Sequence, residues 1–386
     1  MTRHCVSQWG LIGAMLGLAA SGTSRSGATM PSAITIAATP SDTTLYVGET
    51  FTPRATTSDR YGNAVETDVA VTLSQPTGGI GVANGSVTAT TIGRGSVTAT
   101  VGGMHRSIFV SVVPRGTLAV HTPAGVAIVA LDGSQLNVLN SDNSGMAGWS
   151  PNGDQLAYDL APTYGYGAPV RVSDMTGRAR AVSRLFDSAT VQLAPSYSPT
   201  EDWVYFSALT GTPESFRLYR AHRDGTGTQL VPNARPEDDF YQSVSPDGRK
   251  LVYVRRTGGM MDYLRVLDVR TGGVTRIDVP GHSPAWAPAG NKIAYVDMRA
   301  GWVIKLMQPN GRDQRQLSAR GMRYERGLAW SPDGQWLVAR NTKTQRLDLI
   351  EASTGQTLPL GYSERMTFPA WRPPGAALPQ VTASRK

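Results

Sequence analysis

Cysteine and histidine are nearly absent from this sequence. Its 386 residues include one cysteine, Cys5, and five histidines that are scattered along the chain. A single cysteine excludes an intrachain disulfide, a cysteine-based zinc or iron–sulfur site and covalent haem attachment. Because no two histidines stand at ligand spacing, the sequence indicates neither a metal site nor a cofactor.

Charged residues are also scarce. They make up 17% of the chain, and the formal net charge is +8, whereas an average chain has about 25% charged residues. Hydrophobic residues make up 40%, which is enough to build a core, so a disordered chain is not indicated. The 42 glycines and 25 prolines predict a chain rich in turns.

The sequence has one apolar run near its start, and that run is short. From about Val6 to Ala20 a helix would extend about 22 Å, whereas the hydrocarbon core of a bilayer is about 30 Å thick. Residues 1–28 are therefore predicted to be a signal peptide, with a retained N-terminal membrane anchor as the alternative. Either segment places the protein at the periplasmic or extracytoplasmic face of a bacterial membrane.

Residues 30–115 contain short alternating strands at intervals of about ten residues, which predicts a small β-sandwich. Four segments carry a resemblance to the bacterial Ig-like group 2 family, namely Leu45–Thr50, the turn Asp59–Asn63, Asn84–Ala89 and Gly95–Val101. Such modules serve as spacers or adhesion units outside the cytoplasm, and the resemblance implies this for residues 30–115.

Residues 117–373 contain an internal repeat, and residues 374–386 form a tail. Corresponding units begin at Trp149-Ser-Pro, Tyr197-Ser-Pro, Val244-Ser-Pro, Trp286-Ala-Pro, Trp330-Ser-Pro and Trp371-Arg-Pro. A strand-rich period in the forties indicates the blades of a β-propeller. The aromatic residue that opens most units is expected to fill the space between blades.

The two ends of the repeat complement each other. Segments 117–122, 126–131 and 135–139 supply the second, third and fourth strands of a unit, and 368–371 supplies a first strand. Pairing the N- and C-terminal strands would close a six-bladed propeller without exposed edges at the joint. The expected fold is therefore all-β, a sandwich followed by this propeller.

The repeats resemble the WD40-like PD40 repeats of TolB-type propellers across about 255 residues. This resemblance implies the fold, but the repeated residues are structural and name no activity. No serine has glycine at both flanking positions of a nucleophile elbow, and no nucleotide-binding glycine loop is present. We therefore expect no catalytic residues.

Binding residues are expected on the longer loops at one face of the propeller disc, because loops on a rigid scaffold commonly carry function. Aromatic, methionine and arginine side chains on these loops favour a protein partner: Tyr164, Tyr166, Met260, Met261, Trp302, Arg320, Arg323 and Arg326. Tyr241, His282, Arg326 and Phe368 precede the innermost strands and are expected at the rim of the central channel.

These features favour a non-enzymatic interaction or assembly protein, an accessory subunit docked on an envelope membrane complex. A photosynthetic reaction-centre–antenna complex is one such setting. The alternatives are a cell-wall or carbohydrate-binding adhesin that uses the Ig-like module and, as the least favoured, a propeller enzyme. Nucleic acid is not expected as a partner, because an exported chain would meet anionic lipid or an acidic protein first.

Overall fold

The computed structural model describes residues 33–37, 43–65, 70–74, 79–83, 85–101, 103–133, 136–141, 144–160, 169–183, 185–186, 190–212, 214–232, 237–258, 261–361 and 365–374. Every regular secondary-structure element within these ranges is a β-strand. None of the described residues forms a helix that could span a membrane. The expected leader at 1–28 and the tail from 375 lie outside the described residues.

Residues 33–113 form an N-terminal β-domain of three small sheets. One sheet contains β1 (Ala33–Ala37), β4 (Arg54–Ser58) and β5 (Ala64–Val65). The second contains β2 (Thr44–Tyr46), β10 (Met104–Val113), β9 (Gly93–Val101) and β6 (Ala70–Ser74), and the third β3 (Thr50–Phe51), β8 (Ser86–Ala89) and β7 (Ile80–Ala83). Alternate residues of these strands point inward and form one core: Leu45, Phe51, Ile80, Val87, Ala89, Val97, Val110 and Val112.

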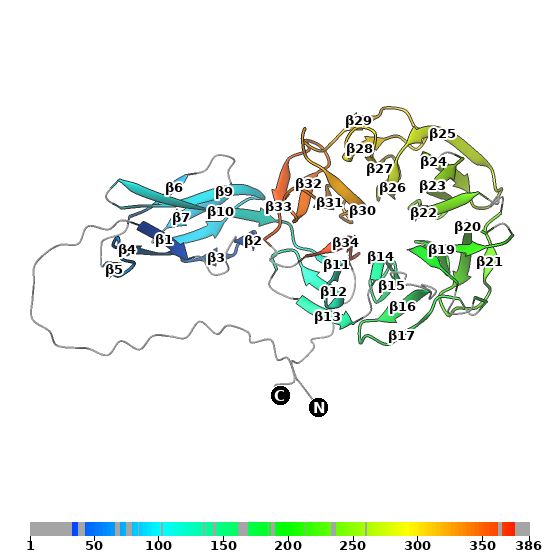
Figure 1. Cartoon of the computed structure of the whole chain (residues 1–386), viewed down its shortest axis with the longest axis horizontal. Helices are drawn as coiled ribbons and strands as arrows, with labels where there is room; N and C mark the ends of the chain where they lie inside the picture. The colour runs from blue at the N-terminus through cyan, green and yellow to red at the C-terminus, as the bar shows by residue number, and fades with distance from the viewer. Residues whose placement is uncertain are drawn as a thin grey trace, which may run out of the picture.

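Six four-stranded sheets follow, arranged as blades around a ring (Figure 1). Blade 1 contains β11 (Thr117–Thr122), β12 (Gly125–Ala130), β13 (Leu136–Asn140) and β34 (Thr367–Trp371); blade 2 contains β14 (Ser144–Trp149), β15 (Gln155–Leu160), β16 (Val170–Asp174) and β17 (Ala179–Ala181). Blade 3 contains β18 (Gln192–Tyr197), β19 (Trp203–Thr210), β20 (Ser215–His222) and β21 (Gln229–Leu230); blade 4 contains β22 (Asp238–Val244), β23 (Lys250–Thr257), β24 (Met261–Asp268) and β25 (Val274–Pro280). Blade 5 contains β26 (His282–Trp286), β27 (Ile293–Asp297), β28 (Val303–Met307) and β29 (Arg315–Gln316); blade 6 contains β30 (Tyr324–Trp330), β31 (Trp336–Asn341), β32 (Leu347–Glu351) and β33 (Thr357–Pro359).

Blade 1 combines strands from both ends of the repeat. β34 pairs antiparallel with β11, with Trp371 opposite Leu118 and Ala370 opposite Ala119. β34 also contacts the innermost strands of both neighbouring blades, β14 and β30. The ladder hydrogen bonds of β34 are thereby made to a strand from the other end of the repeat.

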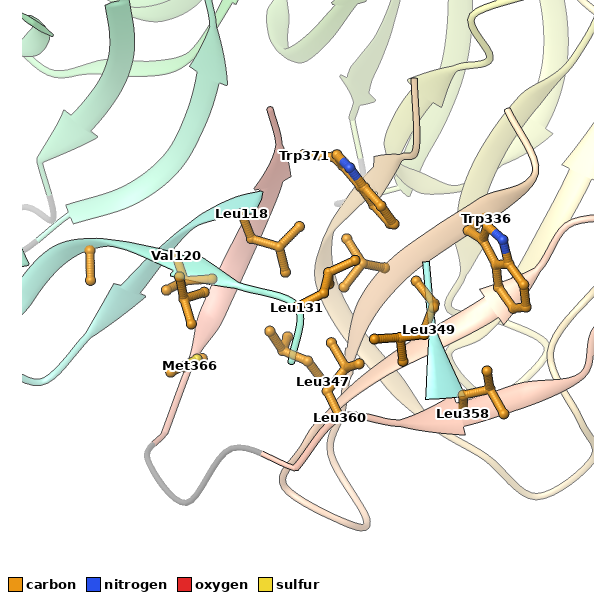
Figure 2. Packing of buried hydrophobic residues seen from close by; sticks show 14 of the residues in the cluster. Leu118, Val120, Leu131, Trp336, Leu347, Leu349, Leu358, Leu360, Met366 and Trp371 are labelled. Carbon is orange, nitrogen blue, oxygen red and sulfur yellow. The ribbon is translucent and has the colours of Figure 1, made fainter. Parts of the chain in front are cut away.

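A shared hydrophobic cluster joins blades 1 and 6 (Figure 2). Leu118 and Leu131 of blade 1 meet Leu347 and Leu349 of blade 6 in this cluster. The indole of Trp371 lies at its edge. Because every side chain here is at least nine-tenths buried, the apolar surface that each blade removes from water stabilises the contact between them.

The N-terminal β-domain is attached to the outer edge of blade 6. Ser111 Oγ of β10 donates to the carbonyl oxygen of Pro359 at 3.1 Å, and the N–H of Gly361 donates to Thr44 Oγ1 at 3.0 Å. Tyr46 of β2 belongs to the cluster of blades 1 and 6. Side chains of the β-domain therefore hold the end of β33 and the residues after it, and β10 lies beside β33 in Figure 1.

Candidate functional site

The innermost strand of every blade pairs irregularly with the second strand. The register against the second strand shifts in all six pairs, which marks a β-bulge in each. In five blades the bulge contains a residue with positive φ, located three positions before the residue that opens the hairpin motif: Ala194, Tyr241, Ser283, Gly327 and Phe368. Left-handed backbone at a non-glycine residue costs about 1–3 kcal/mol and is concentrated at functional sites.

Sequence reasoning missed these bulges, although a signal for them exists. Proline stands directly after the positive-φ residue in three blades, at Pro195, Pro284 and Pro369. Proline lacks the N–H that a regular ladder needs, so within a sheet it is confined to edges and bulges. The structure also corrects the expected position of the channel residues. The innermost strands include Tyr241, Arg326 and Phe368, which were expected before them. His282 is the first residue of β26.

A buried carboxylate joins two of the bulges. Asp159 of β15 accepts hydrogen bonds from the N–H of Met146 at 2.9 Å and from the N–H of Ala194 at 2.7 Å, one in its own blade and one in blade 3. Burial raises the pKa of Asp159 to about 7, against the lowering effect of these N–H groups. Asp159 therefore titrates near neutral pH.

A side-chain amide performs the same role between blades 3 and 4. Gln242, the residue after Tyr241, donates from Nε2 to the carbonyl oxygens of Tyr205 and Ala194 and accepts from Ser207 Oγ at 2.9 Å. All of these groups are buried, so the hydrogen bonds satisfy atoms that would otherwise be costly to bury. The bulges are therefore fixed by contacts between neighbouring blades.

Tyr241, His282 and Arg326 come together near the channel, from blades 4, 5 and 6. The rings of Tyr241 and His282 lie 4.6 Å apart, and the guanidinium of Arg326 lies 5.9 Å from the Tyr241 ring centroid. Burial raises the pKa of Tyr241, while the charge of Arg326 opposes that shift. The sequence predicted one rim of four residues, and the structure brings three of them together, while the fourth, Phe368, lies in β34 of blade 1.

His282 is a buried part of this group rather than an exposed ligand. Burial, followed by the charges of Arg326 and Arg256, lowers its pKa to about 3, so the imidazole is neutral. Asp262 Oδ2 lies 3.6 Å from His282 Nε2, but Arg256 binds the same carboxylate at 2.9 Å and compensates its charge. The His282 imidazole therefore shapes the wall and does not act as a cation.

The other end of the channel is a cavity of about 430 Å³. It is lined by the ends of all six innermost strands, with Trp149, Trp286, Trp330 and Trp371 among its walls. The Trp149 indole N–H donates to the carbonyl oxygen of Ala370 at 3.0 Å, in the neighbouring blade. The aromatic residues of the repeat therefore pack between blades, as expected, and also border the channel.

Aromatic and basic side chains gather on the loops of blades 5 and 6. Trp302 has a φ of 66°, its N–H donates to the carbonyl oxygen of Asp297, and its own carbonyl oxygen accepts from the N–H of Tyr324. The guanidinium of Arg323 lies 5.5 Å from the Trp302 ring. We call Trp302, Arg320 and Arg323 the basic loop face; Arg326, expected on the same loops, lies within β30.

No carboxylate among the described residues forms an ion pair with Arg320, Arg323 or Arg326. Arg320 and Arg323 are exposed, and Arg326 is half-buried. Of the other candidate residues, Tyr164, Tyr166 and Met260 lie outside the described residues. Met261 is the first residue of β24 and not a loop residue. Nowhere in the described ranges do three His, Cys, Asp or Glu side chains gather as a metal site would require.

The described residues form an N-terminal β-domain and a β-propeller, and the loops of blades 5 and 6 carry Trp302, Arg320 and Arg323. The sequence model of the TolB beta propeller domain matches residues 103–375. The chain belongs to this family.

Individual proteins are also similar to this chain. An uncharacterized protein of Agrobacterium fabrum is 30% identical over 166 residues, which cover 39% of this chain and 53% of the relative. The chain thus spans about half the length of the curated relative it matches. TolB from Acinetobacter baumannii has a similar structure, with a TM-score of 0.56, 17% identity and coverage of 79% of this chain and 82% of that one. A putative TolB from Agrobacterium tumefaciens gives a TM-score of 0.52 at 15% identity, with coverage of 66% and 91%. At these identities the structural likeness concerns the fold alone.

Proposed function

We propose that this protein is a non-catalytic scaffold that docks on a membrane protein complex at the extracytoplasmic face of a bacterial membrane. The observation that carries this proposal is the basic loop face. Arg320 and Arg323 are exposed without a carboxylate partner among the described residues, and Trp302 is held in a strained conformation against Arg323. Tryptophan and arginine are the side chains most enriched where proteins bind one another tightly.

The charge of this face indicates the chemistry of the partner. Guanidinium groups form bidentate hydrogen bonds with carboxylates, so the partner presents Asp and Glu side chains to blades 5 and 6. Nucleic acid is not the proposed partner, because a protein at the proposed extracytoplasmic location would meet anionic lipid or an acidic protein first. A reaction-centre–antenna complex remains one setting of this kind.

The proposed architecture has three parts. Residues 1–28 are a signal peptide or a retained anchor, residues 30–115 an Ig-like spacer, and residues 117–373 a closed six-bladed ring. The pairing of β34 with β11 and the contacts of β34 with β14 and β30 support the closed ring. The hydrogen bonds between the N-terminal β-domain and β33 support a spacer that holds the propeller in a defined orientation.

The test is extraction of native membranes in mild detergent, followed by size-exclusion chromatography and mass spectrometry. We expect the full-length chain to elute with a membrane protein complex at a fixed stoichiometry. The most N-terminal peptide that is recovered decides between a cleaved signal and a retained anchor. Recovery as a free monomer would overturn the docking role, and retention on purified peptidoglycan would favour the adhesin alternative.

A further inference from the structure

A second cavity lies where the N-terminal β-domain joins the ring. Its volume is about 410 Å³, and its walls come from the linker at 114–117, the hairpin of blade 6 at 331–336 and the segment 371–374. It borders the channel cavity at Trp371, but the described lining of the channel cavity includes no linker residue. Ligand sites in proteins are commonly cavities of roughly 300–1,000 Å³ at the junction of two domains.

Two buried indoles in its walls have unused N–H groups. Trp336 and Trp371 line the cavity and are 6% and 8% exposed. Neither indole N–H donates a hydrogen bond to any acceptor in the described part of the chain. The indole N–H groups of Trp149, Trp286 and Trp330, by contrast, each donate to a carbonyl oxygen at 3.0 Å. Because a polar group that is buried without a partner is costly, the two unused donors indicate an acceptor that the cavity receives from outside.

Both donors face this cavity. A Cβ atom on Gly116 would lie 2.9 Å from Trp371 Nε1, and Gly116 lines this cavity but not the channel cavity. Trp336 also lines this cavity and not the channel cavity. In Figure 2 the nitrogen atoms of the two indoles lie at the ends remote from Leu347 and Leu360. The two N–H groups therefore point away from the hydrophobic cluster and toward one space.

The charge of the walls is positive. Arg115 and Arg372 line the cavity, and Asp333 is the one carboxylate among its described lining residues. Asp333 Oδ1 already accepts two hydrogen bonds within its own hairpin. Arg115 is exposed, its guanidinium lies 4.8 Å from the Tyr46 ring centroid, and it forms no ion pair with a described carboxylate. A cation would be repelled here, whereas an anion would find a free guanidinium.

We propose that this cavity binds a small carboxylate with an apolar body, held by the indole N–H groups of Trp336 and Trp371 and by Arg115. An ionised carboxylate has two oxygens with about four acceptor sites and no donor, which complements walls with unused N–H groups. The apolar body would lie against the indole rings and against the four prolines of the lining. This site is separate from the basic loop face and does not depend on the docking role.

The test is heteronuclear NMR of the full-length protein with isotope-labelled tryptophan, titrated with phenylpropionate. We expect the indole N–H signals of Trp336 and Trp371 to shift and saturate, with a dissociation constant below about 1 mM. The signals of Trp149, Trp286 and Trp330 should stay in place, because their N–H groups already donate within the protein. Phenylpropanol, which has the same carbon skeleton without the charge, should bind at least about tenfold more weakly.

Three variants separate the contacts. Trp336→Phe keeps an aromatic ring but removes the N–H, and should weaken binding of the acid about fivefold. Arg115→Gln should weaken binding of the acid at least about tenfold and leave binding of the alcohol unchanged. Trp286→Phe is the matched control and should bind like wild type, because the N–H that it removes donates to Gly290 in the same hairpin. Circular dichroism of each variant establishes that the propeller is folded before binding is compared.

Several results would overturn the proposal. One is the absence of a saturable shift of the Trp336 and Trp371 signals up to about 10 mM phenylpropionate. Another is equal affinity for the acid and the alcohol, which would exclude an anion as the ligand. Shifts confined to Trp149, Trp286 and Trp330 would place the probe in the channel cavity instead. Wild-type affinity in both Trp336→Phe and Arg115→Gln would show that the assigned donors do not hold the ligand.

Discussion

Asp159 should make the stability of the propeller depend on pH in a direction opposite to that of most carboxylates. Burial raises its pKa from 3.8 to about 7 in the folded chain, whereas the unfolded chain has the ordinary value. The folded state therefore holds the proton more tightly. The resulting stabilisation is fully present below about pH 4 and is lost as the pH rises through about 7.

The size of the effect follows from the shift. A difference of about three pH units at 1.36 kcal/mol per unit corresponds to about 4 kcal/mol between pH 4 and pH 8. Asp159→Asn removes the titration. Its amide can still accept one of the two N–H groups, from Met146 or Ala194, so the variant keeps part of the link between blades 2 and 3.

The assay is urea unfolding of wild type and Asp159→Asn across this pH range, monitored by tryptophan fluorescence. The stability of wild type relative to the variant should fall by several kcal/mol as the pH rises. Asp268→Asn serves as the control, because hydrogen bonds from Thr271 lower the pKa of the exposed Asp268 carboxyl and give a shift of opposite sign. A difference between wild type and Asp159→Asn that does not change with pH would refute the reasoning.

Three further substitutions test the packing. Tyr46→Ala removes a ring from the cluster between the β-domain and blades 1 and 6 and should cost about 3–5 kcal/mol in urea unfolding, with faster proteolysis between the two parts. Arg255→Met leaves Asp239, which it binds at 2.7 Å, buried without its partner, and should cost about 3–5 kcal/mol by the same method. Trp149→Phe loses the hydrogen bond to Ala370 and should lower the midpoint of thermal unfolding by an amount equivalent to about 1 kcal/mol. A change below about 0.5 kcal/mol in any of the three would contradict the assigned contact.

The blades could be located from the sequence because each repeat consists of short motifs whose residues are close together in the chain. The Ser-Pro turns and the strands that follow them depend on residues close together in the chain. The half-units at 117–139 and 368–371 were also readable, and the structure places both in one sheet as β11–β13 and β34.

The site was less predictable because its contacts are made between blades. Asp159 gave no local signal, since its donors at Met146 and Ala194 are brought together only by the fold. His282 was recognised as lying near the channel, but its burial depends on Phe240 and Tyr241 of the neighbouring blade. The bulges had a partial signal in the prolines of the innermost strands.

The most direct measurement of the central claim is recovery of the partner complex from native membranes by the tagged, full-length chain. Wild type is compared with Arg320→Glu/Arg323→Glu, and Arg249→Glu/Arg270→Glu is the matched control. Arg249 and Arg270 are exposed beside the hairpin turns of blade 4, outside the basic loop face. The account predicts that reversing charge on the basic loop face reduces recovery at least about tenfold, while the control binds like wild type. Equal recovery by all three proteins would contradict a partner bound through this face.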